Sequence, residues 1–285
     1  MNWSDVRDLF RNWREENVRK SQDVVDIWET TLQRKVHKLG DEQYLVLEQV
    51  FTAALDCNRM DVAEDCLDTL SVQFPNSVRI DRLKALKLEA QERFGEALEL
   101  LQSIIKKDNT NAAPRKRRVA IFRACGRIPE AIKELSEYLK KFMIDQEAWQ
   151  ELCDLFLIEQ DYARAAFCME ELILHNPHSH LIHQRFAEIK YTQGGYENLE
   201  LAKSHYCLAV KLNPNNMRAL YGLFLCASQI SMSAKATSQK KKDANKLATW
   251  ALKQINERYE EKCEQASQLA VLEGLTNSLQ ITTAS

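Results

Sequence analysis

The sequence predicts an all-α protein built from a repeated pair of helices, and three observations carry this prediction. Gly and Pro number only seven and five in 285 residues, so residues that interrupt helices are scarce. One alanine recurs at equal intervals along the chain, at Ala63, Ala97, Ala131 and Ala165. Pro75 and Pro177 each stand twelve residues after an alanine of this ladder.

The interval between these alanines is the 34-residue period typical of tetratricopeptide repeats, in which each unit is a helix, a turn and a second helix. The alanine is small because the two helices of one unit cross there, and the proline ends the second helix. Trp149 stands at the fourth position of its unit. Ala202 and Pro214 continue the pattern three residues late, and we place the three extra residues in segment 191–202, where Gly194-Gly195 loosens the turn.

The expected architecture is a right-handed tetratricopeptide α-solenoid with helical caps at both ends. Val24, Trp28, Leu32 and Val36 recur every four residues and indicate a helical N-terminal cap, which an array needs because each repeat exposes an apolar face. The predicted segments are an N-terminal cap at 1–43, five repeats at 44–77, 78–111, 112–145, 146–179 and 180–216, a degenerate sixth repeat at 217–259 with a long loop at 229–243, and a C-terminal cap or tail at 260–285.

Composition and charge indicate a soluble protein without an intrinsic attraction to polyanions. Apolar residues make up 45% and charged residues 28%, and the net charge is -2. This balance disfavours nucleic acid and anionic lipid as partners. The sequence holds neither an apolar run long enough to cross a bilayer nor a signal peptide at its start. We therefore expect a cytosolic protein whose membrane association, if any, is indirect.

Motifs for catalysis and cofactors are missing from the sequence. It contains no GxxxxGK[ST], HExxH or GxSxG pattern, so we expect no enzyme and no cofactor. The eight cysteines form no CxxC pair. Cys57 and Cys125 share one repeat position, and Cys66 and Cys168 share another, which predicts buried packing rather than reactivity or metal binding.

Four histidines, His175, His178, His180 and His183, lie close together in "HNPHSHLIH". Clustered imidazoles can bind a metal, but this segment spans a turn between repeats and lacks cysteine or carboxylate partners. A solvated turn is the preferred interpretation, and no metal is expected.

Basic residues suggest a partner-binding groove. The run at 115–118 and the run at 240–242 fit either solvated charge or contact with an anion. In tetratricopeptide arrays, positions 2, 5, 9 and 12 of each first helix face the groove. We expect partner contacts at eight such positions: Arg79, Arg82, Lys116, Arg123, Gln150, Asp154, Gln184 and Glu188. Ala120 follows Lys116 where co-chaperone arrays carry Asn, so a clamp for a C-terminal carboxylate is missing.

Several phrases resemble one family closely. They are "WREEN" at 13–17, "DQEAWQEL" at 145–152, "DYARAAFCMEEL" at 161–172, "KYTQGGYENLELA" at 190–202 and "NMRALYGLFLCAS" at 216–228. They are similar to the family of subunit 2 of the ER membrane protein complex, over nearly the whole chain.

This resemblance implies a non-catalytic subunit on the cytosolic face of the endoplasmic reticulum membrane. It would organise the cytosolic parts of membrane subunits 3 and 5, and also 1, and would dock the peripheral subunit 8 or 9. The complex would insert tail-anchored and multi-pass proteins into the membrane. Two other classes stay open: a free cytosolic tetratricopeptide adaptor or co-chaperone that binds a peptide in its groove, and an RNA-reading helical repeat.

Overall fold

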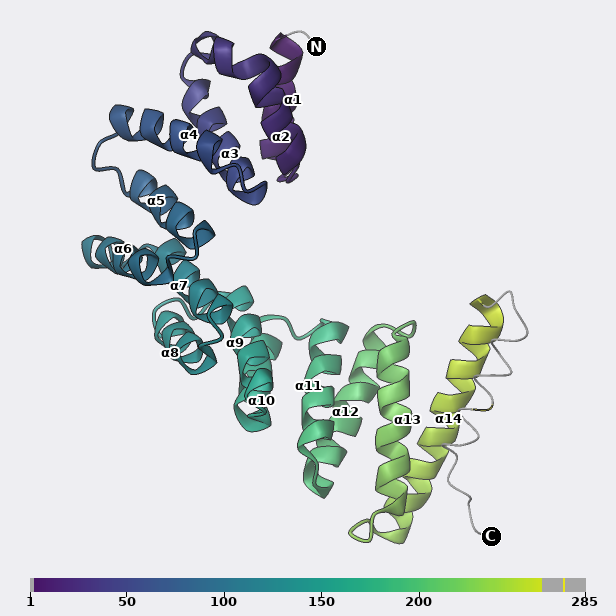
Figure 1. Ribbon diagram of the computed structural model, residues 1–285. Helices are drawn as coiled ribbons and strands as arrows, with labels where there is room; N and C mark the ends of the chain where they lie inside the picture. The colour runs from purple at the N-terminus through teal and green to yellow at the C-terminus, as the bar shows by residue number, and fades with distance from the viewer. Residues whose placement is uncertain (1–2, 263–273, 275–285) are drawn as a thin grey trace. The chain divides into compact units, whose positions relative to one another are not determined.

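The computed structural model describes residues 3–262 and residue 274, and within them helix is the only regular structure (Figure 1). None of the described helices is long and apolar enough to span a bilayer. The helices are α1 Trp3–Glu15, α2 Ser21–Ile27, η1 Trp28–Leu32, η2 Gln33–Leu39, α3 Glu42–Asp56, α4 Met60–Gln73, α5 Val78–Ala90, α6 Phe94–Lys107, α7 Ala112–Ala124, α8 Ile128–Leu139, α9 Gln146–Ile158, α10 Tyr162–His175, α11 His180–Gln193, α12 Tyr196–Leu212, α13 Met217–Met232 and α14 Ser238–Lys262.

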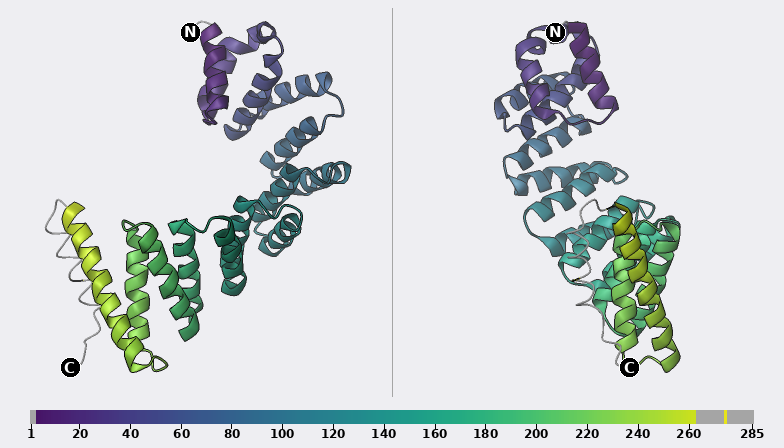
Figure 2. Two further views of the ribbon diagram at one scale, coloured as in Figure 1. Left: turned by 180° about the vertical axis from the view of Figure 1, so that it is seen from behind. Right: turned by 90° about the vertical axis from the view of Figure 1, so that its right-hand side faces the viewer.

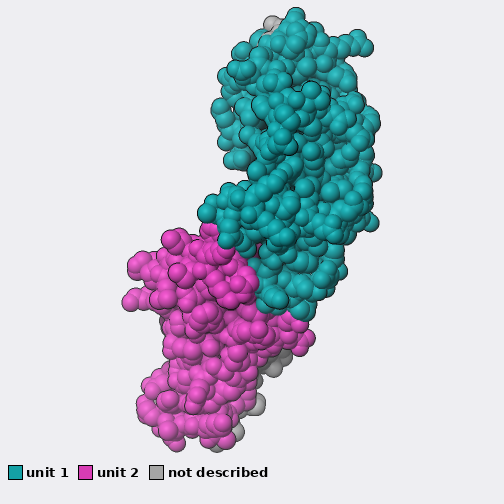
Figure 3. Space-filling view, turned by 90° about the vertical axis from the view of Figure 1, so that its left-hand side faces the viewer, with its two compact units in different colours: residues 1–134 teal, residues 135–285 magenta. Residues whose placement is uncertain are grey.

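The chain forms two compact units, residues 1–134 and residues 135–285 (Figure 3). In unit 1, α3 packs against α4 and α5 against α6. In unit 2 the packed pairs are α9 with α10, α11 with α12, and α13 with α14, and the last two pairs lie side by side in the left view of Figure 2. Helix pairs stacked in this way confirm the predicted all-α solenoid.

The repeated alanines lie in the core of their helix pairs. Ala63, Ala97, Ala131, Ala165 and Ala202 each have 0% of their surface exposed. A side chain larger than methyl at such a site would push the two helices of its pair apart. Pro75, Pro177 and Pro214 each stand two residues beyond the end of a second helix, where Pro cannot continue the helix.

A residue with positive φ follows the first helix in five successive pairs, from α3 with α4 to α11 with α12. The backbone enters the left-handed region at five residues that stand one repeat period apart: Asn58, Glu92, Gly126, Gln160 and Gly194. This conformation ends a helix by turning the chain toward the last free carbonyls, as in the 2.8 Å bond from the Arg59 N–H to the Ala54 carbonyl. Glu92 and Gln160 adopt it at a cost, because their Cβ atoms disfavour positive φ.

The three extra residues lie within 191–202, as expected, but they lengthen α12 rather than the turn before it. Gly194 keeps the repeat spacing from Gln160, and α12 begins at Tyr196, two residues later, as in the other pairs. Ala202, however, lies eight residues after Gly194, where Ala165 lies five after Gln160. The insertion therefore adds almost one turn to the start of α12.

The N-terminal cap is helical but not a uniform α-helix. After α2, the chain widens into a π-helical turn, η1, and then tightens into the 3₁₀-helix η2. Apolar residues spaced by four drift by about 40° per step on an α-helix with 3.6 residues per turn. The wider π turn offsets this drift, so that Val24, Trp28 and Leu32 all stay buried against the core.

The long loop predicted at 229–243 is wrong. Helix α13 continues to Met232 and α14 begins at Ser238, which leaves a connection of only residues 233–237. The polar composition of "SQKKKD" predicts a loop, yet this stretch forms the first turns of α14. The buried Ala244, Ala248 and Ala251 hold α14 against α13. The predicted C-terminal cap lies outside the described residues, except for the end of α14.

Candidate functional site

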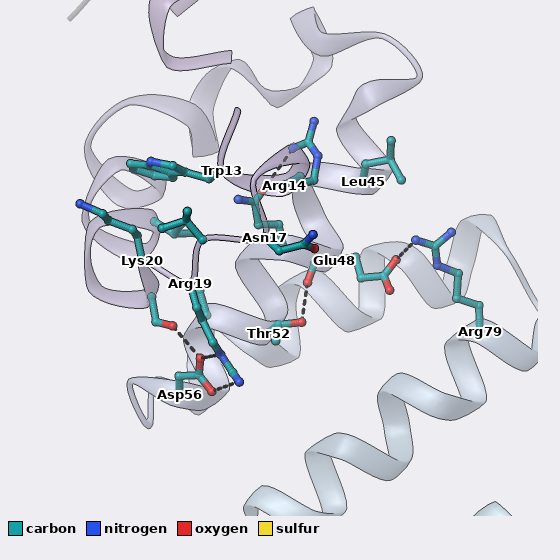
Figure 4. Close-up of a pocket in the computed structure, with 15 residues that line it drawn as sticks. Trp13, Arg14, Asn17, Arg19, Lys20, Leu45, Glu48, Thr52, Asp56 and Arg79 are labelled. Carbon is teal, nitrogen blue, oxygen red and sulfur yellow. Dashed lines mark hydrogen bonds and ion pairs between the residues drawn. The ribbon is translucent and has the colours of Figure 1, made fainter. Parts of the chain in front are cut away.

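The first groove lies in unit 1, among the end of α1, the segment that follows it, α3 and α5. This N-terminal groove has a volume of about 380 Å³ and is lined by Arg14, Arg19, Glu48, Asp56 and Arg79 among others (Figure 4). Asp56 accepts hydrogen bonds from the Arg19 Nε and the Ser21 hydroxyl, both at 2.6 Å. These bonds attach the segment after α1 to the end of α3 and so shape one wall.

The predicted groove contacts Arg79, Arg82, Lys116 and Arg123 form a basic strip, and Glu48 of the neighbouring helix α3 pairs with the first two of them. Arg79 pairs with Glu48, and Arg82 lies 3.4 Å from the same carboxylate, so one side chain of α3 holds two arginines of α5. Lys116 and Arg123 lie on α7, the first half-buried and the second exposed near the helix end. The strip is thus not a uniformly cationic surface.

The basic run at 115–118 is likewise engaged within unit 1. Arg117 pairs with Glu89 at 2.5 Å, Arg118 pairs with Glu134 at 3.2 Å, and Arg115 donates to the Asn109 side chain. The run at 240–242 lies on α14, where Lys240 reaches Glu200 at 3.6 Å. The described contacts therefore favour the solvated or paired interpretation of both runs over contact with an anion.

The second groove lies in unit 2, along the first helices of three successive pairs, α9, α11 and α13. This polar groove has a volume of about 550 Å³ and collects four predicted residues: Gln150, Asp154, Gln184 and Glu188. A chain of charges crosses it, which runs from Asp154 to Arg185 at 3.4 Å, to Glu188 at 3.7 Å, and to Arg218 at 2.5 Å. Arg185 and Arg218, which complete this chain of charges, are among the lining residues that sequence reasoning missed.

The predicted residues of the polar groove differ in their access to solvent. Gln150 and Asp154 are exposed on α9 and can meet a partner. Gln184 is 7% exposed and donates its amide to Glu188 at 2.9 Å. Its amide therefore holds Glu188 in place, and Gln184 itself stays among the residues that line the groove.

The histidine cluster is only in part the solvated turn that the sequence predicts, because His175 and His178 are exposed whereas His183 is buried. His183 is 3% exposed; its Nε2 lies 2.9 Å from the Pro177 carbonyl and its Nδ1 lies 3.1 Å from Nδ1 of His205. A carbonyl only accepts, so His183 carries its proton on Nε2 and His205 must donate from Nδ1. Burial, with smaller contributions from His183 and Lys190, lowers the pKa of His205 to about 4. Among the described residues, no cluster fit to hold a metal ion is found.

Among the seven described cysteines, four are buried, Cys57 and Cys207 are half-buried, and Cys125 is exposed. Burial raises the pKa of the thiols to about 12 at four positions: Cys66, Cys153, Cys168 and Cys226. Such thiols stay protonated near neutral pH and pack as small apolar groups. Cys125 is exposed, contrary to the prediction, because it follows the last residue of α7 and lies in the turn.

Two further grooves on unit 2, both apolar, were missed by sequence reasoning. Groove A, about 350 Å³, lies between α8 and α10 over α9 and is lined by Leu139, Met143, Trp149, Phe156 and Phe167, with Lys140 and Arg164. Groove B, about 530 Å³, lies between α12 and α14 over α13 and is lined by Val210, Pro214, Leu223, Leu247 and Trp250, with Lys211 and Arg258.

A stack of helix pairs with lined grooves and buried alanines defines a tetratricopeptide-repeat protein. The sequence model of the EMC2 TPR-like repeat domain matches residues 64–202. The chain is 49% identical to ER membrane protein complex subunit 2 of Xenopus tropicalis, covering 98% of this chain and 96% of the relative. The chain therefore belongs to the ER membrane protein complex subunit 2 family, which confirms the resemblance.

A more distant relative agrees with this family assignment, and one solved structure agrees with the fold. ER membrane protein complex subunit 2 of Dictyostelium discoideum is 34% identical over 88% of this chain and 81% of its own length. Among solved structures, the C-terminal part of a TPR repeat-containing protein from Cytophaga hutchinsonii superposes with a TM-score of 0.60 at 14% identity, covering 94% of this chain and 99% of that one. The latter likeness shows the fold alone.

Proposed function

We propose that the chain is a non-catalytic scaffold subunit of the ER membrane protein complex, acting on the cytosolic face of the endoplasmic reticulum membrane. The observation that carries this proposal is the near full-length identity of 49% with a protein named as subunit 2 of that complex. A stack of helix pairs supports it physically, because an extended repeat surface can hold several partners in a fixed geometry.

The role extends to the insertion of tail-anchored and multi-pass proteins, with the scaffold organising the cytosolic parts of membrane subunits 3, 5 and 1 and of the peripheral subunit 8 or 9. Polar and charged positions that the repeat is expected to turn toward its concave face supply the contacts. In unit 2 these are Gln150, Asp154 and Glu188, and in unit 1 they are Arg79, Arg82, Lys116 and Arg123. Gln184 contributes by fixing the position of Glu188.

The first test is affinity purification of the tagged chain from detergent-solubilised membranes and from the cytosolic fraction, with mass spectrometry of the bound proteins. Stoichiometric recovery of several integral membrane subunits, with a tagged chain that carbonate releases from membranes, is expected. Recovery of soluble chaperones or RNA alone would overturn the scaffold function and favour an adaptor or an RNA reader.

A second test follows the chain without its partners. A subunit whose obligate contacts cover much of its surface depends on those contacts for stability. The orphan chain is expected to be degraded faster than the assembled one in a pulse–chase experiment. Equal half-lives with and without the membrane subunits would argue against obligate assembly.

A further inference from the structure

Grooves A and B occupy equivalent places in the repeat. Leu139, Lys140 and Met143 of groove A correspond to Val210, Lys211 and Pro214 of groove B. The members of each corresponding pair are separated by two repeat periods and the three-residue insertion. The same position of the repeat therefore forms a groove twice in unit 2, on the face that the second helices of the pairs form.

The intervening position is filled. His183 stands one repeat period after Trp149, and Phe186 stands one period after Leu152. There the His205 ring packs edge-on to Phe186 at 4.5 Å and against His183 at 5.2 Å between ring centroids. Stacked helix pairs therefore do not always leave a groove at this position, because side chains fill it once and leave it open twice.

The open grooves expose apolar surface that a folded chain would be expected to bury. Met143 is 65% exposed, Phe167 52% and Trp250 44%. Trp149 already satisfies its indole N–H by donating to the Met143 carbonyl at 2.9 Å, and its ring meets Phe167 edge to face at 6.1 Å. Groove A thus offers apolar and aromatic surface rather than hydrogen bonds, as docking sites do.

The charges that line both grooves have one sign. Each groove contains one lysine and one arginine, and no carboxylate stands among the described side chains that line either. In groove A, Lys140 and Arg164 pair with Glu137 and Asp161 outside the lining, in exposed contacts that a partner's carboxylate can replace at small cost. The charge therefore fits a partner with acidic residues beside its apolar ones.

The secondary structure of the partner follows from the lining. An extended segment leaves its backbone groups unpaired, and a wall made mainly of apolar side chains cannot pair them. A helix satisfies its backbone internally and presents side chains at i, i+3, i+4 and i+7 to a groove between two helices. We propose that grooves A and B are two equivalent docking sites for amphipathic helices of a partner protein, each with an apolar face flanked by Asp or Glu.

This proposal deepens the proposed scaffold function, on which it rests, by naming the surface and the partner chemistry. The probe is a helical peptide of about four turns with Leu at i, i+3, i+4 and i+7 and Glu at both flanks, titrated calorimetrically into the full chain. Two sites per chain are expected, and a matched peptide with Lys flanks should bind at least about tenfold more weakly, the loss expected for removed charge complementarity.

Variants separate the two sites. Phe167→Glu should abolish the site in groove A and Trp250→Glu the site in groove B, so each is expected to halve the stoichiometry and the double variant to abolish binding. Both side chains are partly exposed, so the folds should persist, which circular dichroism checks. Val72→Glu is the matched control, because Val72 is 83% exposed in unit 1 outside both grooves, and it should retain two sites.

Several outcomes would overturn the proposal. They are no saturable binding of the Glu-flanked peptide, equal binding of the Lys-flanked peptide, or unchanged stoichiometry in the two groove variants. If the peptide does not bind, two further assays identify the occupant. Sedimentation with phosphatidylserine vesicles that Phe167→Glu abolishes would assign the surface to lipid. Self-association in the ultracentrifuge that Phe167→Glu abolishes would assign it to a second copy of the chain. Copurification with membrane subunits is an independent measurement, so peptide binding can fail while the scaffold function stands, and the reverse.

Discussion

Units 1 and 2 share one repeat geometry but differ in what they leave at the surface. Of the described large apolar side chains that are exposed, four lie in unit 1 and eleven in unit 2. In unit 1 the charged groove residues are held by neighbours, as Glu48 holds Arg79 and Arg82. The positions that specify the fold are buried in both units, so the exposed positions are free to take different chemistry, and unit 2 carries the more apolar surface.

The largest expected effects come from truncating buried leucines, one in each unit. Leu101 in unit 1 and Leu220 in unit 2 are both 0% exposed, so Leu101→Ala and Leu220→Ala should each lower the free energy of unfolding by about 2–5 kcal/mol. Urea unfolding measures the loss. Amide hydrogen exchange should show the loss of protection mainly in the unit that carries the substitution. Equal loss of protection in both units would mean that the two units unfold together. Val72→Ala is the exposed control.

A close helix contact in unit 2 has an open counterpart in unit 1. A Cβ at Gly222 would lie 2.4 Å from ring carbons of Tyr206, whereas one at Gly95 would meet nothing within 4 Å. Gly222→Ala should therefore destabilise by about 1–3 kcal/mol, from overpacking. Gly95→Ala should stabilise by about 0.5–1 kcal/mol, from helix propensity. Thermal unfolding compares the two, and a neutral or stabilising Gly222→Ala would show that Tyr206 yields easily.

The buried imidazole pair makes the stability of unit 2 sensitive to acid. The folded-state pKa of His205, about 4, lies below the ordinary 6.5, so the unfolded chain binds the proton more readily between these values. Stability should fall as pH drops from 6.5 toward 4, and this contribution should level off below. The His205→Asn variant keeps a donor for Nδ1 of His183 but cannot titrate at this position. Its unfolding free energy should therefore fall less between pH 7 and pH 5 than that of the unaltered chain. Identical pH profiles of the unfolding free energy would refute this assignment.

The smallest effect on stability is expected at the paired charges of unit 1. Glu48→Gln removes the surface ion-pair partner of two arginines and should change the unfolding free energy by less than about 1 kcal/mol. It should nevertheless raise the affinity of unit 1 for polyglutamate in a salt-sensitive manner, because Arg79 and Arg82 lose their carboxylate. Glu96→Gln, which frees only Arg93, is the control. No gain over that control would mean that Glu48 does not mask the strip.

Local pattern alone was enough to predict most of the helices. The repeat period and the scarcity of Gly and Pro predicted where the helix pairs lie, because helix periodicity and helix termination depend on only a few neighbouring residues. The alanine positions followed from the same period. Composition failed at 238–243, where a polar run is held in α14 by the packing of α14 against α13.

Tertiary structure decided the features that depend on residues far apart in the chain. Three features depend on contacts with distant residues, which a local pattern does not predict. They are the left-handed turns at Glu92 and Gln160, the π turn at Trp28–Leu32 and the burial of His183 beside His205. The pairing of Arg79 with Glu48 and the two apolar grooves depend on which side chains of neighbouring helices meet. The sequence by itself determined the repeat and its family, because these rest on spacing and similarity. Packing decided which positions were filled and which were left open, because that depends on side-chain volume and charge across helices that belong to different repeats.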